Sequence, residues 1–320
     1  MALASGLRMY TPPKSVVGFE RRNMFLPAIY ASEGDAILML HEPEKHALRE
    51  ISERRPDLRL LCLPDLKGLE EPLSPWGWNL SLRTMLARSG YPETLLPSEE
   101  TLACWRMLAH RRNAIMVREY SGEDEFMWPK EFSDRFGAKE FMIAFGRVML
   151  KMPWSSSGRG VLVVTKENYE QGLRRIRECI ARQGSIVIEP MYDNACDFAT
   201  EWESDGREVY FKGFSMFETD SQGRYKGNVA APQDVILDGL AKYTRVDKLQ
   251  VIPKLLRPLL KTIFLQRSEM PYVGPFGVDG LIDTHRRIVP CIEVNLRRTM
   301  GHVALDAYAS GYENPFLCVQ

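Results

Sequence analysis

Two acids, an amide and an arginine near the C-terminal end have the types and spacing of a site for a metal or a phosphate. Glu293, Asn295 and Arg297 alternate with apolar residues, so a β-strand would place all three side chains on one face. Asp279 lies in an apolar run that precedes them across a short polar turn, which predicts a β-hairpin. Carboxylate and amide oxygens without Cys or His suit Mg²⁺. An exposed strand face with ordinary salt bridges is the alternative interpretation.

A second candidate site lies in residues 147–164, where two apolar runs flank a Ser/Gly-rich loop. This pattern predicts a strand, a loop and a second strand. The glycines let the backbone approach a ligand closely, and the amides and hydroxyls of the loop are donors that can cradle phosphates. Lys151, just before the loop, could add a positive charge to the same phosphates. The loop fits neither GxxxxGK[ST] nor GxGxxG, and a flexible hairpin turn is the alternative.

The N-terminal part of the chain predicts a small α/β unit ahead of both sites. Residues 36–40 and 58–63 are short apolar runs typical of strands, and residues 44–54 between them indicate a helix. A strand, a helix and a strand in succession usually form a parallel pair. Two more helices follow, for which Asn79 and Ser98 are good N-caps.

The elements around the Ser/Gly-rich loop and the hairpin predict mixed helices and antiparallel strands. A helix capped by Thr165 follows the loop. A long helix with a strong apolar stripe covers residues 248–266, and Pro258 is expected to kink or restart it. Strands are predicted between these helices at residues 185–192, 198–202 and 208–217.

Composition narrows the class of protein. With 320 residues and 45% hydrophobic content, the chain can bury a large core and form two or three subdomains. Lys plus Arg and Asp plus Glu both number 42, which argues against nucleic-acid binding through bulk charge. The six cysteines are scattered without CxxC spacing, which excludes a zinc signature and disfavours a disulfide framework. No run approaches the roughly 18 apolar residues of a membrane helix, so we expect no membrane association and a cytoplasmic location.

In their order along the chain, these patterns resemble the ATP-grasp superfamily, whose members include carboxylate–amine ligases. The likeness is carried by Lys151 with the loop 155–160, by the strand 186–192, by Asp197, and by Asp279 with the strand around Glu293. The expected fold class is α/β and α+β, an ATP-grasp fold with a small N-terminal α/β (pre-grasp) domain. The expected domains are residues 1–105 and 106–320, the second divided into two α+β subdomains at about 106–190 and 191–320.

The resemblance implies that ATP lies between the two α+β subdomains, with one or two Mg²⁺ ions on its phosphates. Asp279, Glu293 and Asn295 would hold the metal. Asp197 would lie near the ribose. The hinge strand would contact adenine through Glu189, Pro190, Met191 and Tyr192. The phosphates would meet Lys151, Ser155, Ser156, Ser157, Gly158, Arg159 and Gly160.

Two points stay open within this resemblance. Family members often carry a lysine well upstream of the loop lysine; here Arg111 and Arg112 are the nearest candidates, and Lys139 lies too close to the loop. The basic cluster that contains these arginines could equally be a solvated helix end. Asp283 also competes with Asp279 for the metal, because both are expected to face the same side of the strand.

The activity implied by the resemblance is ATP-dependent ligation of a carboxylate to an amine through an acylphosphate, with small-molecule or peptide substrates. Lys151 and Arg297 are the expected catalytic residues, and Arg297 could hold the acylphosphate or the substrate carboxylate through two hydrogen bonds. A structural ion pair is the alternative for Arg297. A kinase with the same fold, or a nucleotide-binding regulator without turnover, is the alternative function.

Overall fold

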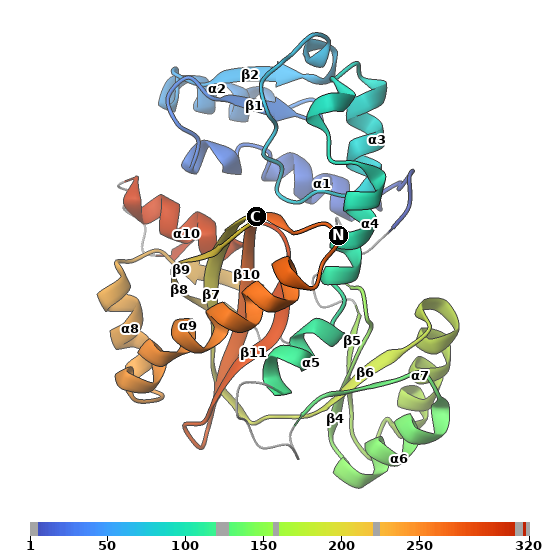
Figure 1. Cartoon of the computed structure of the whole chain (residues 1–320). Helices are drawn as coiled ribbons and strands as arrows, with labels where there is room; N and C mark the ends of the chain where they lie inside the picture. The colour runs from blue at the N-terminus through green and yellow to red at the C-terminus, as the bar shows by residue number, and fades with distance from the viewer. Residues whose placement is uncertain (1–5, 120–127, 156–159, 220–224, 311–315, 318–320) are drawn as a thin grey trace.

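The computed structural model describes residues 6–119, 128–155, 160–219, 225–310 and 316–317. Within those residues the strands form three sheets, each with its own helices (Figure 1). This mixture of α/β and α+β units agrees with the predicted fold class. No helix of the described part has the length and apolar character needed to cross a bilayer.

The N-terminal unit contains a parallel pair of strands, as predicted. Strand β1 (Ala36–Met39) pairs with β2 (Arg59–Cys62), and α2 (Lys45–Arg54) connects them. Helix α1 (Lys14–Arg22) and the 3₁₀ turns Leu26–Ile29 and Leu63–Leu66 complete this unit. Ile37, Ile51 and Leu58 form a small core between the elements.

Two capped helices lead from this unit into the rest of the chain. Helix α3 (Leu80–Arg88) starts where the Asn79 side chain accepts a hydrogen bond from the Leu82 amide, and the 3₁₀ turn Glu93–Leu95 follows it. Helix α4 (Glu99–Leu108) starts where Ser98 accepts from the Thr101 amide. Both predicted caps are confirmed. The proposed domain boundary near residue 105 falls within α4 and stays a prediction.

A small antiparallel sheet carries the Ser/Gly-rich loop. Its strands, in the order β3 (Lys130–Phe132), β6 (Ile186–Pro190), β4 (Val148–Lys151) and β5 (Val161–Val164), are packed under α6 (Arg135–Phe145) and α7 (Tyr169–Gln183). The two predicted strands that flank the loop are therefore confirmed. The prediction that Thr165 caps α7 is wrong, because the helix begins after Asn168, whose side chain accepts from the Thr165 amide.

Side-chain alternation gives the small sheet one face under α6 and α7 and an opposite face, which we call the open face because neither of these helices covers it. Val148 and Leu150 of β4, with Ile188 of β6, point into the core beneath the two helices. Lys151 and Glu189 have the opposite parity, so they lie together on the other face. The sequence pattern thus turns a lysine and an acid away from the helices.

The larger antiparallel sheet holds the predicted hairpin. Its strand order is β11 (Ile288–Asn295), β10 (Val273–Asp283), β7 (Asn194–Asp205), β8 (Val209–Thr219), β9 (Tyr225–Val229) and β12 (Phe316–Leu317). Helices α8 (Gln233–Ala241) and α9 (Val246–Lys261) pack on one face, where Trp202 is buried. Helix α10 (Met300–Ala309) also contacts this sheet, and Gly301 near its start lies beside Glu201, which alternates with Trp202 along β7.

Of the two outcomes expected at Pro258 in α9, a kink or a restart, the structure excludes the restart. The helix runs through Pro253 and Pro258 to Lys261 and continues as a π-helical turn, Thr262–Gln266, so it does not restart at Pro258. Its buried leucines, among them Leu256 and Leu260, lie in the main core. Burial of this stripe outweighs the hydrogen bonds that the prolines remove.

Helix α5 (Arg112–Glu119) joins the two antiparallel sheets. It follows α4 and packs against β11 of the larger sheet, while its Arg118 reaches Glu189 on β6 of the small sheet. In Figure 1 the helix lies between β11 and the strands β4, β5 and β6. The candidate residues on the two open faces therefore meet around this helix.

Candidate functional site

The hairpin brings the predicted metal-site residues together. Asp279 on β10 stands opposite Glu293 on β11, and Gly277 stands opposite Asn295. The Asn295 amide donates to Asp279 Oδ2 at 2.8 Å. Arg297 Nη2 donates to Asn295 Oδ1 at 3.1 Å. Acid, amide and guanidinium thus form one continuous chain of polar contacts, as their spacing predicted.

Asp283 has a different environment from Asp279. It is buried at the hairpin turn, where its carboxylate accepts hydrogen bonds from the backbone amides of His285 and Arg287, each at 2.9 Å. The Arg287 side chain also contacts it at 2.7 Å. Asp283 is therefore occupied in closing the turn, and Asp279 is the acid that faces Glu293.

The two facing acids differ in their electrostatics. Burial raises the pKa of Asp279 to about 8, and the nearby negative charges of Glu293 and Glu201 act in the same direction. Burial also opposes ionisation of Glu293, but the charges of Arg111 and Lys151 outweigh it and hold the pKa of that carboxyl below its usual value. The pair therefore favours one proton and one negative charge in the absence of an added cation.

Arg111 connects the open faces of the two sheets. Its Nη2 lies 3.0 Å from Glu293 Oε1 and donates to Ser155 Oγ at 3.0 Å, while its Nε donates to the Met152 carbonyl at 3.0 Å. The side chain is buried, and its Nη1 has no hydrogen-bond partner among the described residues. An anionic ligand would satisfy this buried donor.

A buried charge cluster occupies the open face of the small sheet. Glu189 contacts Lys151 through Oε1, and its Oε2 lies 3.4 Å from Arg118 Nη1. All three side chains are almost fully buried. Arg118 also donates to the Tyr192 hydroxyl, and its guanidinium lies 5.4 Å from the centre of the Tyr192 ring. Lys151 and Arg118 thus both contact the Glu189 carboxylate.

The remaining predicted residues each have contacts of their own. Arg112 turns away to an ion pair with Glu131, 2.8 Å from Nη2 to Oε1, so Arg111 rather than Arg112 reaches Glu293. Asp197 accepts from Asn194 and Thr219, and burial raises the pKa of its carboxyl. Pro190 ends β6, and Met191 follows it, its amide bonded to the Arg147 carbonyl. Gly160 follows the loop, and Ser156, Ser157, Gly158 and Arg159 lie outside the described residues.

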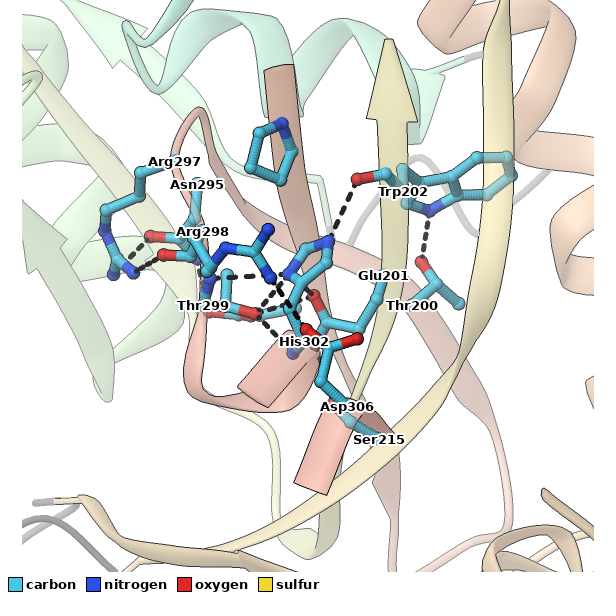
Figure 2. A network of polar contacts seen from close by, with 12 residues as sticks. Thr200, Glu201, Trp202, Ser215, Asn295, Arg297, Arg298, Thr299, His302 and Asp306 are labelled. Carbon is cyan, nitrogen blue, oxygen red and sulfur yellow. Dashed lines mark hydrogen bonds and ion pairs between the residues drawn. The ribbon is translucent and has the colours of Figure 1, made fainter. Parts of the chain in front are cut away.

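A second buried network, which the sequence did not predict, lies next to Asn295 (Figure 2). Glu201 accepts from Thr299 Oγ1 at 2.7 Å and from Ser215 Oγ at 2.8 Å, and its carboxylate lies 2.9 Å from His302 Nδ1. The other ring nitrogen of His302 lies 3.0 Å from the Trp202 carbonyl. The Thr299 backbone amide also donates to His302 Nδ1 at 3.3 Å, so the ring is held between the start of α10, the Glu201 carboxylate and a carbonyl of β7.

The oxygen atoms of the hairpin fit a hard divalent cation. The described residues contain no group of three or more His, Cys, Asp or Glu side chains arranged to hold a metal. A metal would therefore draw on two carboxylates, one amide and phosphate oxygens of a ligand, which is the usual arrangement for Mg²⁺. The raised pKa of Asp279 supports this fit, because a cation between the acids would stabilise the charge that burial and Glu293 oppose.

Comparison with known proteins gives one curated relative and several structural neighbours. No protein-family model matches the chain. The chain is 24% identical over 297 residues to the [butirosin acyl-carrier protein]–L-glutamate ligase of Niallia circulans. The matched region covers 89% of this chain and 65% of that relative. The chain thus spans slightly less than two thirds of the length of that relative.

Solved structures share the fold at low sequence identity. N5-carboxyaminoimidazole synthetase from Staphylococcus aureus matches with a TM-score of 0.52 and 10% identity, over 94% of this chain and 78% of that one. The biotin carboxylase domain of Hydrogenobacter thermophilus 2-oxoglutarate carboxylase matches with a TM-score of 0.50 and 14% identity, over 95% and 59%. Both neighbours are ATP-grasp fold proteins. This chain therefore has the ATP-grasp fold that these neighbours share.

Proposed function

We propose that this protein is an ATP-dependent ligase that joins a carboxylate to an amine through an acylphosphate. The observation that carries the proposal is the position of Arg111 between the open faces of the two sheets. Its Nη2 pairs with Glu293, and its buried Nη1 has no hydrogen-bond partner among the described residues. That arrangement suits phosphates placed between the sheets. The relative from Niallia circulans is named as a ligase, and a structure of the Staphylococcus aureus synthetase contains ADP.

The residues of the small sheet bind the nucleotide. Lys151 and Arg111 contact its phosphates, and Glu189 orients Lys151 through the ion pair between them. Ser155 and Gly160 lie beside the phosphates, while Pro190, Met191 and Tyr192 line the adenine and Asp197 lies near the ribose. Asp279, Glu293 and Asn295 hold Mg²⁺, which supplies charge neutralisation on the phosphates.

The first chemical step forms the acylphosphate. An oxygen of the substrate carboxylate attacks the γ-phosphorus of ATP, the bond between that phosphorus and ADP breaks, and ADP leaves. The protein contributes position and charge rather than covalent chemistry. Lys151 and Arg111 stabilise the negative charge on the transferring phosphoryl group.

The second step forms the amide bond. The amine nitrogen attacks the acyl carbon, the bond from that carbon to the phosphate oxygen breaks, phosphate leaves, and the proton from nitrogen passes to solvent. Arg297, whose guanidinium already lies against Asn295 at 3.1 Å, holds the acylphosphate through hydrogen bonds. The substrates are small molecules or peptides. A carrier protein is a further acceptor to test, because the name of the curated relative includes an acyl-carrier protein.

Product analysis tests this function against its alternatives. Pools of amino acids and other carboxylates, with amines and with an acyl-carrier protein, are incubated with Mg·ATP, and ADP and phosphate are measured. Ligation predicts that ADP and phosphate appear together only when a carboxylate and an acceptor are both present. ADP without phosphate would identify a kinase, and nucleotide binding without either product would identify a regulator.

A further inference from the structure

Glu201 stands in the same row of the larger sheet as Asn295. On β7 it pairs with Gly277 of β10, and Gly277 pairs in turn with Asn295 of β11. Residues directly opposite one another in antiparallel strands point to the same face. The buried acid therefore shares a face with the candidate metal site, with only a glycine between them in the row.

Two glycines make the space that the Glu201 carboxylate fills. A β-carbon on Gly277 would lie 2.9 Å from Glu201 Oε2, and a β-carbon on Gly301 would lie 1.8 Å from Oε1. Gly301 is in the first turn of α10, directly after the N-cap Thr299 and Met300. The carboxylate is thus packed between β10 and the start of α10, where it bonds to Thr299 and pairs with His302 (Figure 2).

The short segment between Asn295 and Thr299 carries Arg297. One end of this segment is fixed by the strand pairing of β11, and the other by the contact of Thr299 with Glu201. Between these ends, Arg297 donates to the Asn295 side chain and to the Arg298 carbonyl, at 3.1 and 3.0 Å. A shift of the Thr299 end would move the backbone from which Arg297 projects.

We propose that Glu201 is a positioning residue that, through Thr299 and His302, holds the Arg297 segment in its productive place beside Asn295. The proposal rests on the function proposed above, in which Arg297 holds the acylphosphate. It distinguishes Glu201 from the metal ligands, because its carboxylate is occupied by Thr299, Ser215 and His302.

The kinetic test compares Glu201→Gln and Thr299→Val with wild type. Glu201→Gln removes the charge that pairs with His302, and Thr299→Val removes the hydroxyl that bonds to Glu201. We expect kcat for ADP release to fall about 10- to 100-fold in each, because small displacements of a positioning group have effects of this size. The dissociation constant of Mg·ATP should change by less than about twofold, since Lys151 and Arg111 lie on other elements.

Matched controls separate positioning from general loss of stability. Glu203→Gln removes a carboxylate from the same face of β7, where it is half exposed and 3.5 Å from Lys212, and kcat should stay at the wild-type value. Thr299→Ser keeps the hydroxyl and should restore kcat relative to Thr299→Val. Rates are measured below the melting temperature of every variant. Unchanged kcat in both Glu201→Gln and Thr299→Val would overturn the proposal.

Amide hydrogen exchange supplies a readout that does not depend on turnover. Residues 296–299 should exchange faster in Glu201→Gln than in wild type, while β4 and β6 keep their protection. Equal protection of residues 296–299 in both proteins would overturn the proposal even if the ligase function holds. If wild type releases no ADP with any substrate pool, the proposed function fails, and the exchange comparison still decides whether Glu201 fixes this segment.

Discussion

Replacement of Glu189 by glutamine should destabilise the protein strongly. The carboxylate is 5% exposed and lies between Lys151 and Arg118, which are 5% and 0% exposed. Glutamine keeps the shape but removes the negative charge, so two buried cations lose their shared counterion. Removing one partner from a buried ion pair costs about 3–5 kcal/mol. Because Arg118 keeps its contact with Tyr192, we expect a loss near the lower end, about 3 kcal/mol.

Guanidinium unfolding followed by tryptophan fluorescence and circular dichroism measures this loss. Glu203→Gln, which removes the exposed pair with Lys212, serves as the control and should cost less than about 1 kcal/mol. Adding Lys151→Met to Glu189→Gln should recover part of the loss, since one of the two buried cations that faced the carboxylate is then removed. Equal stability of Glu189→Gln and Glu203→Gln would refute the buried cluster as a stabilising charge network.

Three further predictions follow from the same contacts. Lys151→Ala should abolish most of the rise in melting temperature that Mg·ATP gives wild type, a rise worth about 2.7 kcal/mol at a hundredfold excess over Kd; an unchanged rise would remove Lys151 from the nucleotide site. Glu293→Gln should keep the fold but lose most ADP release, and wild-type turnover in this variant would exclude Glu293 as a metal ligand. Burial opposes ionisation of Glu201, but His302, Thr299 and Ser215 outweigh it and lower the pKa below the ordinary 4.5. The stability that ionised Glu201 gives the folded protein is fully present above the pKa of Glu201 in the unfolded chain and is lost as pH falls through its pKa in the folded protein. Wild type should therefore lose more stability than Glu201→Gln on acidification from about pH 5 to about pH 3. Equal losses would contradict an ionised Glu201 in the folded protein.

The sequence was sufficient to predict the local elements of the candidate site. Period-two alternation placed Glu293 and Asn295 on one strand face, and the polar turn before residue 288 indicated the hairpin that pairs Glu293 with Asp279. Arg297, predicted to continue the same strand, lies beyond the end of β11 at Asn295. The apolar runs on either side of the Ser/Gly-rich loop likewise predicted the paired strands β4 and β5. These features depend on residues close in sequence, where the strand period determines the direction of each side chain.

The contacts that the sequence did not predict join residues far apart. Arg118 looks like an ordinary basic residue near the end of a helix, and only the packing of α5 against both sheets buries it beside Glu189, 71 positions away. Thr299 and Glu201 are 98 positions apart, and the signal that could have indicated their contact is the pair of glycines that leaves room for the acid. Long-range pairing of buried charges depends on tertiary packing, which periodicity does not encode.

The fate of the substrate's carboxylate oxygen tests the central claim most directly. A carboxylate identified by stimulated ADP release is labelled with ¹⁸O at both oxygens, incubated with Mg·ATP, the acceptor and wild-type protein, and the released phosphate is analysed by mass spectrometry. Formation of an acylphosphate between the two sheet faces predicts one ¹⁸O atom in each phosphate released. Amide formation with unlabelled phosphate would contradict the acylphosphate route and the roles assigned to Lys151, Arg111 and Arg297.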